Sequence, residues 1–431
     1  MCKIINYILI FIFCVFSIKS LYAQEISEKQ VESQMIQVMS FLKNREFKKA
    51  IKSSNKILKI CEKEQLDPII KGVANSIIGI SIYNLSPNDS TLYSHLKRAE
   101  EIYSIEEFDN DIRFINLKCI IAYEESIEDY HSAIINLDKY IKLKNLRNNS
   151  KELYIESIIK LSDYYAKIKD YCNAIKYEKE VLDYYSILNV KSKVMEFLWR
   201  ISTLYGLSNN YHQAAIYLSN ALNNTIELYG KNDIVYLKQM HGLSLYYFGS
   251  NDFVKAIEIG EKILPTYYQI IGANEEYMSI LQTLAYSHTI LGNINHSIEY
   301  YKEIISIAES NLSIYLSEYI QAMGFLAREF SRQGKNTEAI SILNKLSYFV
   351  ENKSIFDLYI RTILSSINAS DITLEYSDGV CGNIKADFLT DFDLYIILRY
   401  MQRKDLVKYF KEYGVKKLPL CEKGELYLNE V

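Results

Sequence analysis

Apolar residues recur along most of this chain with the spacing of amphipathic helices, and breaks in that pattern mark the turns. One representative segment predicts a helix over residues 155–167, where Leu161 lies on the apolar face, and a second helix over residues 171–185, where Ala174 faces inward. Asp170 marks the turn between them. A small residue at Ala174 lets the two helices approach closely. The segment therefore predicts an antiparallel pair of helices.

The same pair of patterns returns at a nearly constant interval. From Ala133 onward, a small residue in the same local setting recurs after 41, 40, 42, 41 and 42 positions. An earlier gap of 83 positions leaves room for one degenerate unit near Leu92. A period of this length without a strand signal predicts stacked helix pairs. The seven small residues are Ala50, Ala133, Ala174, Ala214, Ala256, Ser297 and Ala339.

At this point the chain resembles the tetratricopeptide repeat family, in the longer-period variant found in kinesin light chains. The resemblance implies an all-α, right-handed superhelical solenoid of about eight antiparallel helix pairs with a C-terminal helical cap. It covers about residues 30–350, and the family's usual period is about 34 residues. Two units match the family pattern at corresponding positions: Leu161, Ser162, Tyr165, Tyr171 and Ala174, then Leu243, Ser244, Tyr247, Phe253 and Ala256.

Three units depart from the family pattern. Glu124 stands where the first helix should carry an aromatic residue, and Asn336 stands where the second helix should carry one. The unit near Leu92 lacks the small residue altogether. We expect these three helix pairs to be distorted.

The N-terminus has the pattern of a secretory signal peptide over residues 1–23. A basic start is followed by an apolar run over residues 7–18 and by a small residue, Ala23, after which we expect cleavage. The run is short for a membrane span, which needs about 20 apolar residues. We therefore expect an exported, periplasmic or secreted protein without an integral span after removal of the signal; an uncleaved N-terminal anchor is the alternative.

The expected repeat region covers residues 24–351, and residues 352–431 fall out of phase with it. Two helices are predicted there, over residues 387–402 and 405–413. A solenoid needs an end unit that covers its last apolar face. We interpret residues 352–431 as a helical cap, with a small separate helical domain as the alternative.

The cysteines outside the signal peptide do not form a disulfide framework, because they are sparse and odd in number. Cys119 and Cys172 occupy helix positions suited to a small apolar residue, so we expect buried thiols. Cys381 and Cys421 lie in the same C-terminal region, and a disulfide between them stays open.

Composition and motifs point away from several functional classes. The formal net charge is −4 and no basic block stands out, which argues against nucleic acid as a partner. No histidine has metal-ligand spacing with cysteine or aspartate, and we expect His288 to be a packed core residue. Asp391 and Asp393 flank a predicted helix start, where carboxylates are favoured. We therefore predict no catalytic residues, no metal and no cofactor.

The predicted function is the binding of a protein or peptide in the concave groove lined by the first helices of the pairs. Trp and Arg side chains are common anchors in such surfaces. Packing of the only tryptophan against a neighbouring helix is the alternative. The positions expected to face the groove are Lys118, Trp199, Lys238, His241, Gln282, Tyr286, Arg328 and Arg332.

Two other functions fit the same pattern. The chain could be the sensory repeat domain of an envelope signalling system that lacks its own output domain. It could also bind glycans at the cell surface, although sugars are normally read by stacked aromatics and the chain has a single Trp.

Overall fold

The computed structural model of the chain describes residues 25–64, 66–106, 111–347, 417–418 and 426–427. Within these residues the chain is almost entirely helical, as the periodicity predicts. The expected signal peptide, the two predicted C-terminal helices, the aspartates at 391 and 393 and the possible Cys381–Cys421 disulfide lie outside the described residues.

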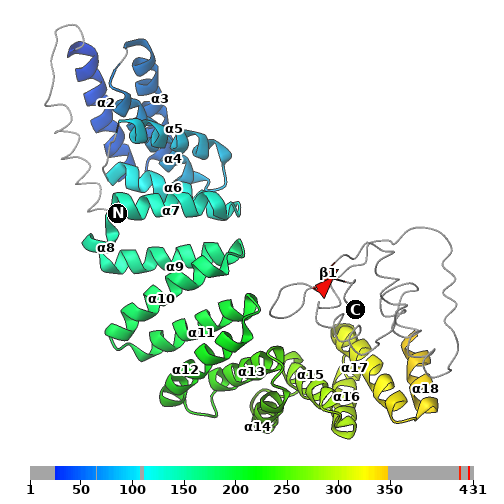
Figure 1. The fold of residues 1–431 in the computed structure, drawn as a ribbon. Coiled ribbons are helices and arrows are strands. Elements are labelled where there is room, and N and C mark those ends of the chain that lie inside the picture. Colours follow the sequence, from blue (N-terminus) through cyan, green and yellow to red (C-terminus); the bar gives the residue numbers. More distant parts are fainter. Residues whose placement is uncertain (1–24, 65, 107–110, 348–416, 419–425, 428–431) are drawn as a thin grey trace. The chain divides into compact units, whose positions relative to one another are not determined.

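The chain divides into two compact units, Met1–Val181 and Leu182–Val431. Contacts in a helical repeat are local, so such arrays separate readily into compact parts. The helices of the first unit follow one another in chain order (Figure 1): α2 (Glu25–Lys43), α3 (Phe47–Glu64), α4 (Pro68–Leu85), α5 (Ser90–Ile105), α6 (Asp111–Ser126), α7 (Tyr130–Leu143), α8 (Leu146–Asn149), α9 (Lys151–Lys167) and the start of α10 (Tyr171–Ile187).

The second unit continues with the end of α10 and eight further helices in the described residues. Two short antiparallel strands of two residues each follow, β1 (Lys417–Leu418) and β2 (Leu426–Tyr427). The helical pattern of the sequence did not predict them. The helices are α11 (Lys191–Leu207), α12 (Tyr211–Tyr229), α13 (Ile234–Gly249), α14 (Phe253–Ile271), α15 (Glu275–Ile290), α16 (Ile294–Glu309), α17 (Leu312–Arg332) and α18 (Asn336–Ser347).

Each turn inside a helix pair uses the same backbone geometry. A residue in the left-handed region lies five positions before each of the seven recurring small residues, and only two of these seven turns use glycine. The residues and their φ angles are Arg45 (58°), Glu128 (61°), Lys169 (62°), Asn209 (60°), Asn251 (63°), Gly292 (79°) and Gly334 (75°). The period of the sequence is therefore also a period of backbone conformation.

Hydrogen bonds explain why these turns are so uniform. At Lys169 the first helix ends in a Schellman motif: the Asp170 N–H donates to the carbonyl of Tyr165 at 2.8 Å, and the Lys169 N–H donates to that of Ala166 at 3.0 Å. Asp170 then caps the second helix, because its carboxylate accepts from the Asn173 N–H at 3.1 Å. One residue thus closes one helix and opens the next.

The seven recurring small residues are fully buried, as predicted. In two pairs a serine on the first helix contacts the small residue directly. Ser162 Oγ donates to the carbonyl of Ala174 at 3.1 Å, and Ser244 Oγ donates to that of Ala256 at 2.8 Å. A small side chain on each helix therefore brings the two helices close enough for the serine hydroxyl of one to donate to a backbone carbonyl of the other.

The unit near Leu92 forms a regular helix pair, α4 with α5, although it lacks the small residue on its second helix. The close approach comes from the first helix, where a Cβ added at Gly79 would lie 2.5 Å from Cγ of Leu96. Glycine on α4 thus accommodates a leucine on α5. The expected distortion is wrong for this unit, because the small residue that permits close packing lies on the first helix, α4, and not on the second helix, α5.

The cysteines divide between interior and surface. Cys61 and Cys119 are buried free thiols, and burial raises the pKa of the Cys119 thiol to about 12. Cys172 is exposed, which corrects the prediction of a buried thiol. It is the second residue of α10, and the buried side of that helix is set by Ala174 and Ile175 instead.

Candidate interaction surface

In the second unit, polar side chains join the first helices of three successive pairs, α13, α15 and α17. We call this set the first-helix stripe: Lys238 and His241 of α13, Glu276, Ser279 and Gln282 of α15, and Ser317, Glu318 and Gln321 of α17. The α13 and α15 helices pack on each other, and so do α15 and α17. The stripe is therefore one continuous surface across neighbouring helices.

At one end of the stripe, α13 contacts α15 through an ion pair and a histidine. Lys238 Nζ lies 3.0 Å from Glu276 Oε1, and Glu276 also accepts a hydrogen bond from the Tyr267 hydroxyl. Both interactions lower the pKa of the Glu276 carboxyl, the tyrosine hydrogen bond most. His241 Nε2 lies 3.3 Å from Ser279 Oγ, and burial lowers the pKa of His241 to about 4. The imidazole is therefore neutral at pH 7.

At the other end, α15 contacts α17 through an amide chain. Gln282 Nε2 donates to Gln321 Oε1 at 2.9 Å and to the Tyr286 hydroxyl at 3.0 Å. Gln321 Nε2 donates in turn to Ser317 Oγ at 3.3 Å. Both side-chain N–H groups of Gln282 donate to neighbouring side chains. The amide oxygen is therefore the group through which Gln282 can accept a hydrogen bond from a binding partner.

A small pocket opens beside this amide chain, between α15, α16 and α17. It has room for about one water molecule, and the space around it is open to solvent. Glu318 stands out in its wall, because the Oε2 atom is buried and no polar group of the described residues lies within hydrogen-bonding distance of it. The lining residues are Met278, Gln282, Tyr301, Ile304, Glu318 and Ala322.

The structure brings together three of the predicted groove residues, Lys238, His241 and Gln282, on the stripe. Tyr286 and Arg328 were predicted to face the groove, but they lie in the interior, 5% and 9% exposed. Tyr286 packs against three aromatic rings, of which Phe325 is nearest, with ring centroids 4.7 Å apart. Its helix position points toward the next helix pair, whose side chains cover it.

Arg328 and Arg332 of α17 serve a buried carboxylate. Arg328 Nη2 lies 2.7 Å from Oε1 of Glu329, and Arg332 Nη1 lies 3.1 Å from Oε2. Glu329 is fully buried, so its charge needs these partners. The Arg328 guanidinium also lies over the Phe325 ring, 4.9 Å from the centroid. The described contacts of both arginines are thus contacts within the fold.

Trp199 and Lys118 occupy different environments. Trp199 is partly buried and packs against the core of the second unit, as the alternative interpretation held. Lys118, in the first unit, is exposed, and its ammonium lies 5.4 Å from the centroid of the Tyr140 ring. Neither side chain belongs to the first-helix stripe.

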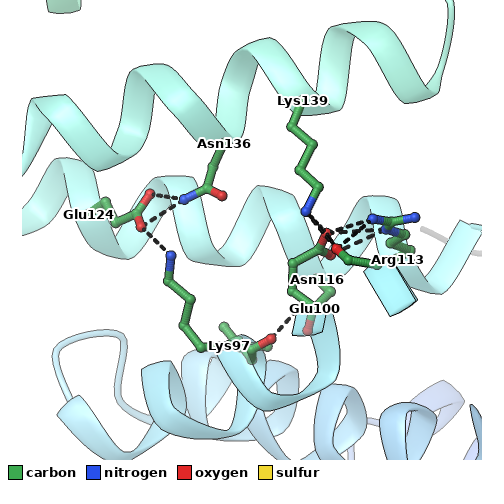
Figure 2. Close-up of polar contacts among 9 residues, drawn as sticks. Lys97, Glu100, Arg113, Asn116, Glu124, Asn136 and Lys139 are labelled. Carbon is green, nitrogen blue, oxygen red and sulfur yellow. Dashed lines mark hydrogen bonds and ion pairs between the residues drawn. The ribbon is translucent and has the colours of Figure 1, made fainter. Parts of the chain in front are cut away.

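In the first unit, α6 and α7 are joined by a buried carboxylate that the family pattern marked as a departure. Glu124 is fully buried, and Asn136 Nδ2 donates to both of its oxygens at 2.8 and 2.9 Å (Figure 2). Tyr93 donates to Oε1 at 2.8 Å, and Lys97 Nζ lies 3.3 Å from the same oxygen. Glu124 is therefore well paired, and the helix pair is formed, contrary to the expected distortion.

The positions of Glu124 and Asn136 within the repeat explain why a polar pair is found here. Glu124 lies nine residues before Ala133 and Asn136 three residues after it. The corresponding residues around Ala174 are Tyr165 and Tyr177, whose rings stack with centroids 5.8 Å apart. In the α6/α7 pair, a carboxylate–amide contact thus replaces an aromatic contact at both positions together.

A second buried ion cluster lies nearby. Arg113 Nη2 is 2.8 Å from Glu100 Oε1, and Lys139 Nζ is 2.5 Å from the same oxygen (Figure 2). Ser104 Oγ accepts from Arg113 at 3.1 Å and from Lys139 at 2.8 Å. Glu100 and Arg113 are buried and pair with each other, while Lys139, whose side chain is 34% exposed, adds a second cation that water can reach.

His288 is buried and stacks on His296 and Tyr300, so the prediction of a packed core histidine is confirmed. Asn336 begins α18, a regular helix that packs on α17. The pair is nevertheless distorted as expected, because α17 is kinked at Tyr315, whose φ and ψ are −106° and 27°. No cluster of three metal-ligating side chains occurs in the described part of the chain. None of the described helices is long and apolar enough to span a membrane.

No protein-family model matches the sequence, and no curated protein matches it. Among solved structures, the chain is similar to the apo form of RapI, at 13% identity over 79% of this chain and 98% of that one, with a TM-score of 0.46. It is similar to BtubC (BKLC) from P. vanneervenii at 14% identity over 60% and 98%, with a TM-score of 0.42. A tetratricopeptide repeat protein from Parabacteroides merdae aligns at 13% identity over 67% and 99%, with a TM-score of 0.36.

Proposed function

We propose that this chain is an exported scaffold that binds a polypeptide segment along the first-helix stripe of its second unit. The observation that carries the proposal is the continuity of the stripe: paired polar side chains link three successive first helices beside a pocket that holds a buried carboxylate oxygen. An extended polypeptide carries donors and acceptors at regular intervals, and a row of amide, hydroxyl and charged groups can meet several of them.

Site-specific photocrosslinking tests this surface. A photoreactive amino acid replaces Lys238 or Gln321 on the stripe, and Glu258, exposed on the second helix α14, provides the control position. In an envelope extract we expect both stripe positions to give the same discrete polypeptide adduct, and position 258 to give none. Equal adducts from all three positions, or no adduct from the stripe, would refute the proposed surface.

The same capture is then quantified with substitutions. We expect Gln282→Ala together with Gln321→Ala to weaken binding of the captured polypeptide about tenfold or more, because two amide groups at the centre of the contact are lost. Glu258→Ala should leave the affinity unchanged. Circular dichroism of each variant shows whether the helices remain formed.

Export is tested separately by mass spectrometry of the protein purified from its native cell envelope. We expect the mature chain to begin at Gln24, after removal of residues 1–23. A chain that retains Met1 in the membrane fraction would instead support the N-terminal anchor.

A further inference from the structure

Five lysines lie along one face of α3, the second helix of the first pair (Figure 1). They follow one another after four, four, three and four residues, so that they lie within about 80° of one another around the helix axis. All five are exposed, and the buried residues of α3 lie on the opposite side of the helix. The sequence has no contiguous basic block, but the helix brings its separate lysines together. We call this set the lysine row: Lys48, Lys52, Lys56, Lys59 and Lys63.

The lysine row is not neutralised by acidic side chains. In the described part of the chain none of its five ammonium groups forms an ion pair, whereas Lys49, beside the row, pairs with Glu46. The helix contains six lysines and two glutamates, although acidic residues outnumber basic ones in the whole chain, 53 to 49. Like charges three or four residues apart on a helix repel each other. The row therefore disfavours the helix that carries it.

The repeat itself does not require lysine at these positions. The five lysines lie two residues before and two, six, nine and thirteen residues after the small residue Ala50. The corresponding residues of α14 are also exposed, but only one of them is a lysine. They are Val254, Glu258, Lys262, Pro265 and Gln269. The lysine row is thus a property of α3 alone in this comparison, which indicates a role other than packing.

A bilayer that contains anionic lipids fits this row better than a small anion or a nucleic acid does. The row is straight and about 22 Å long, because α-helices rise 1.5 Å per residue. A flat anionic surface can contact all five ammonium groups at once, whereas a single phosphate ion reaches only neighbouring ones. The row has no arginine or aromatic side chain, which are the usual groups that read or stack on bases. The choice of a lipid also rests on the proposed export, which brings the chain to a membrane.

We propose that the lysine row binds the anionic phospholipid headgroups of a membrane surface. The opposite face of α3, with Ala50 and Ile57, is packed in the core of the first unit. It cannot enter the lipid as the apolar face of a free amphipathic helix does. The contact is therefore electrostatic and is reversed by salt. It also relieves the repulsion between the lysines, because each ammonium gains an opposite charge.

Cosedimentation of the full chain with lipid vesicles tests the proposal. Neutral vesicles of phosphatidylcholine are compared with vesicles that contain about 40% phosphatidylglycerol, in about 0.1 M NaCl, where charges act over about 10 Å. The apolar run of residues 7–18 is the same in every variant, so differences between variants report the lysines. We expect binding to the anionic vesicles to be stronger, and about 0.5 M NaCl to remove the difference.

Substitutions locate the contact. Each lysine near an anionic surface strengthens binding about fivefold, so the triple variant Lys52→Gln, Lys56→Gln and Lys59→Gln should weaken binding to anionic vesicles about 100-fold. Arginine at the same three positions should restore it. The control removes the same charge from three exposed lysines elsewhere and should have little effect. It combines Lys167→Gln, Lys231→Gln and Lys262→Gln.

Photocrosslinking tests direct contact. A photoreactive amino acid in place of Asn55, which is exposed beside the row, should form adducts with phosphatidylglycerol. The same group in place of Glu258 on α14 should form none. Equal effects of the two triple variants, or equal binding to neutral and anionic vesicles, overturn the proposal. Binding of a DNA duplex or of polyglutamate through these lysines without binding to vesicles would assign the row to another polyanion and overturn it as well.

The outcomes separate this inference from the proposed function. If the triple glutamine variant still captures the polypeptide but the unsubstituted chain ignores anionic vesicles, the scaffold function stands and the membrane contact is wrong. If the lysine row binds anionic vesicles but the stripe captures no polypeptide, the membrane contact stands and the scaffold function is wrong.

Discussion

Replacement of Glu124 by alanine should destabilise the first unit by about 3–5 kcal/mol, the usual cost of removing one partner from a buried charged pair. The estimate follows from the contacts of the carboxylate. Asn136, only 6% exposed, and Tyr93 both lose their acceptor, and each buried unpaired donor costs about 1–3 kcal/mol. Lys97 adds less, because its side chain is 35% exposed and can turn to water.

The measurement is urea unfolding followed by circular dichroism, together with hydrogen exchange of peptides from α6 and α7. The neighbouring residue provides a matched control. Glu125 pairs with Lys160 at 3.0 Å, but both side chains are about half exposed. Glu125→Ala should therefore cost less than about 1 kcal/mol. Equal effects of the two alanine variants would refute the assignment of Glu124 as a buried structural charge.

A double-mutant cycle tests whether Glu124 and Asn136 replace an aromatic pair. Glu124→Tyr and Asn136→Tyr should each destabilise the unit, because each leaves a polar partner beside a ring. The double variant recreates the chemistry of the stacked Tyr165–Tyr177 pair and should recover about 1–3 kcal/mol relative to the sum of the single changes. Strict additivity would mean that the two positions do not act as a pair.

Three further substitutions test the backbone and the stripe. Gly79→Ala should destabilise by about 1–3 kcal/mol in thermal unfolding, because the new methyl overlaps Leu96; an unchanged melting temperature would contradict the close approach. Lys169→Gly should stabilise by about 1 kcal/mol in urea unfolding, because glycine adopts the left-handed conformation without strain. The pKa of His241 is lowered from 6.5 to about 4. Between these two pH values His241 is therefore protonated in the unfolded chain but neutral in the folded chain. Stability should fall as the pH drops from 6.5 to 4, and His241→Gln should reduce that slope.

The repeat architecture was predictable because its signals are local and redundant. Ala174 and Ala256 each reveal a close helix contact, and the same contact recurs at one interval, so no single position has to be interpreted correctly. The left-handed turn residues were harder to find. Lys169 and Glu128 adopt this conformation without being glycine, since the Schellman hydrogen bonds hold the backbone there.

The buried polar networks were not predictable from the same signals. Glu124 departs from the expected pattern, and taken alone it suggested distortion. Its compensation comes from Asn136 in the next helix and from Tyr93 and Lys97 in the previous pair. The two substitutions are connected only by their positions in the repeat, because residues 124 and 136 correspond to residues 165 and 177. A search for repeats in which both of these positions lack an aromatic residue could have found the contact.

The candidate surface was predicted in part, and the errors have one physical cause. Helical periodicity within one pair separates residues that face the partner helix from those that do not, and it assigned Lys238 and Tyr286 alike to the open side. Each pair is also covered by the following pair, which buries a second stripe on every first helix. Tyr286 lies on that second stripe against Phe325, whereas Lys238 lies beyond it and remains exposed. Each first helix therefore buries two sets of side chains, one against its partner helix and one against the following pair. Only the side chains that belong to neither set are exposed and can contact a binding partner.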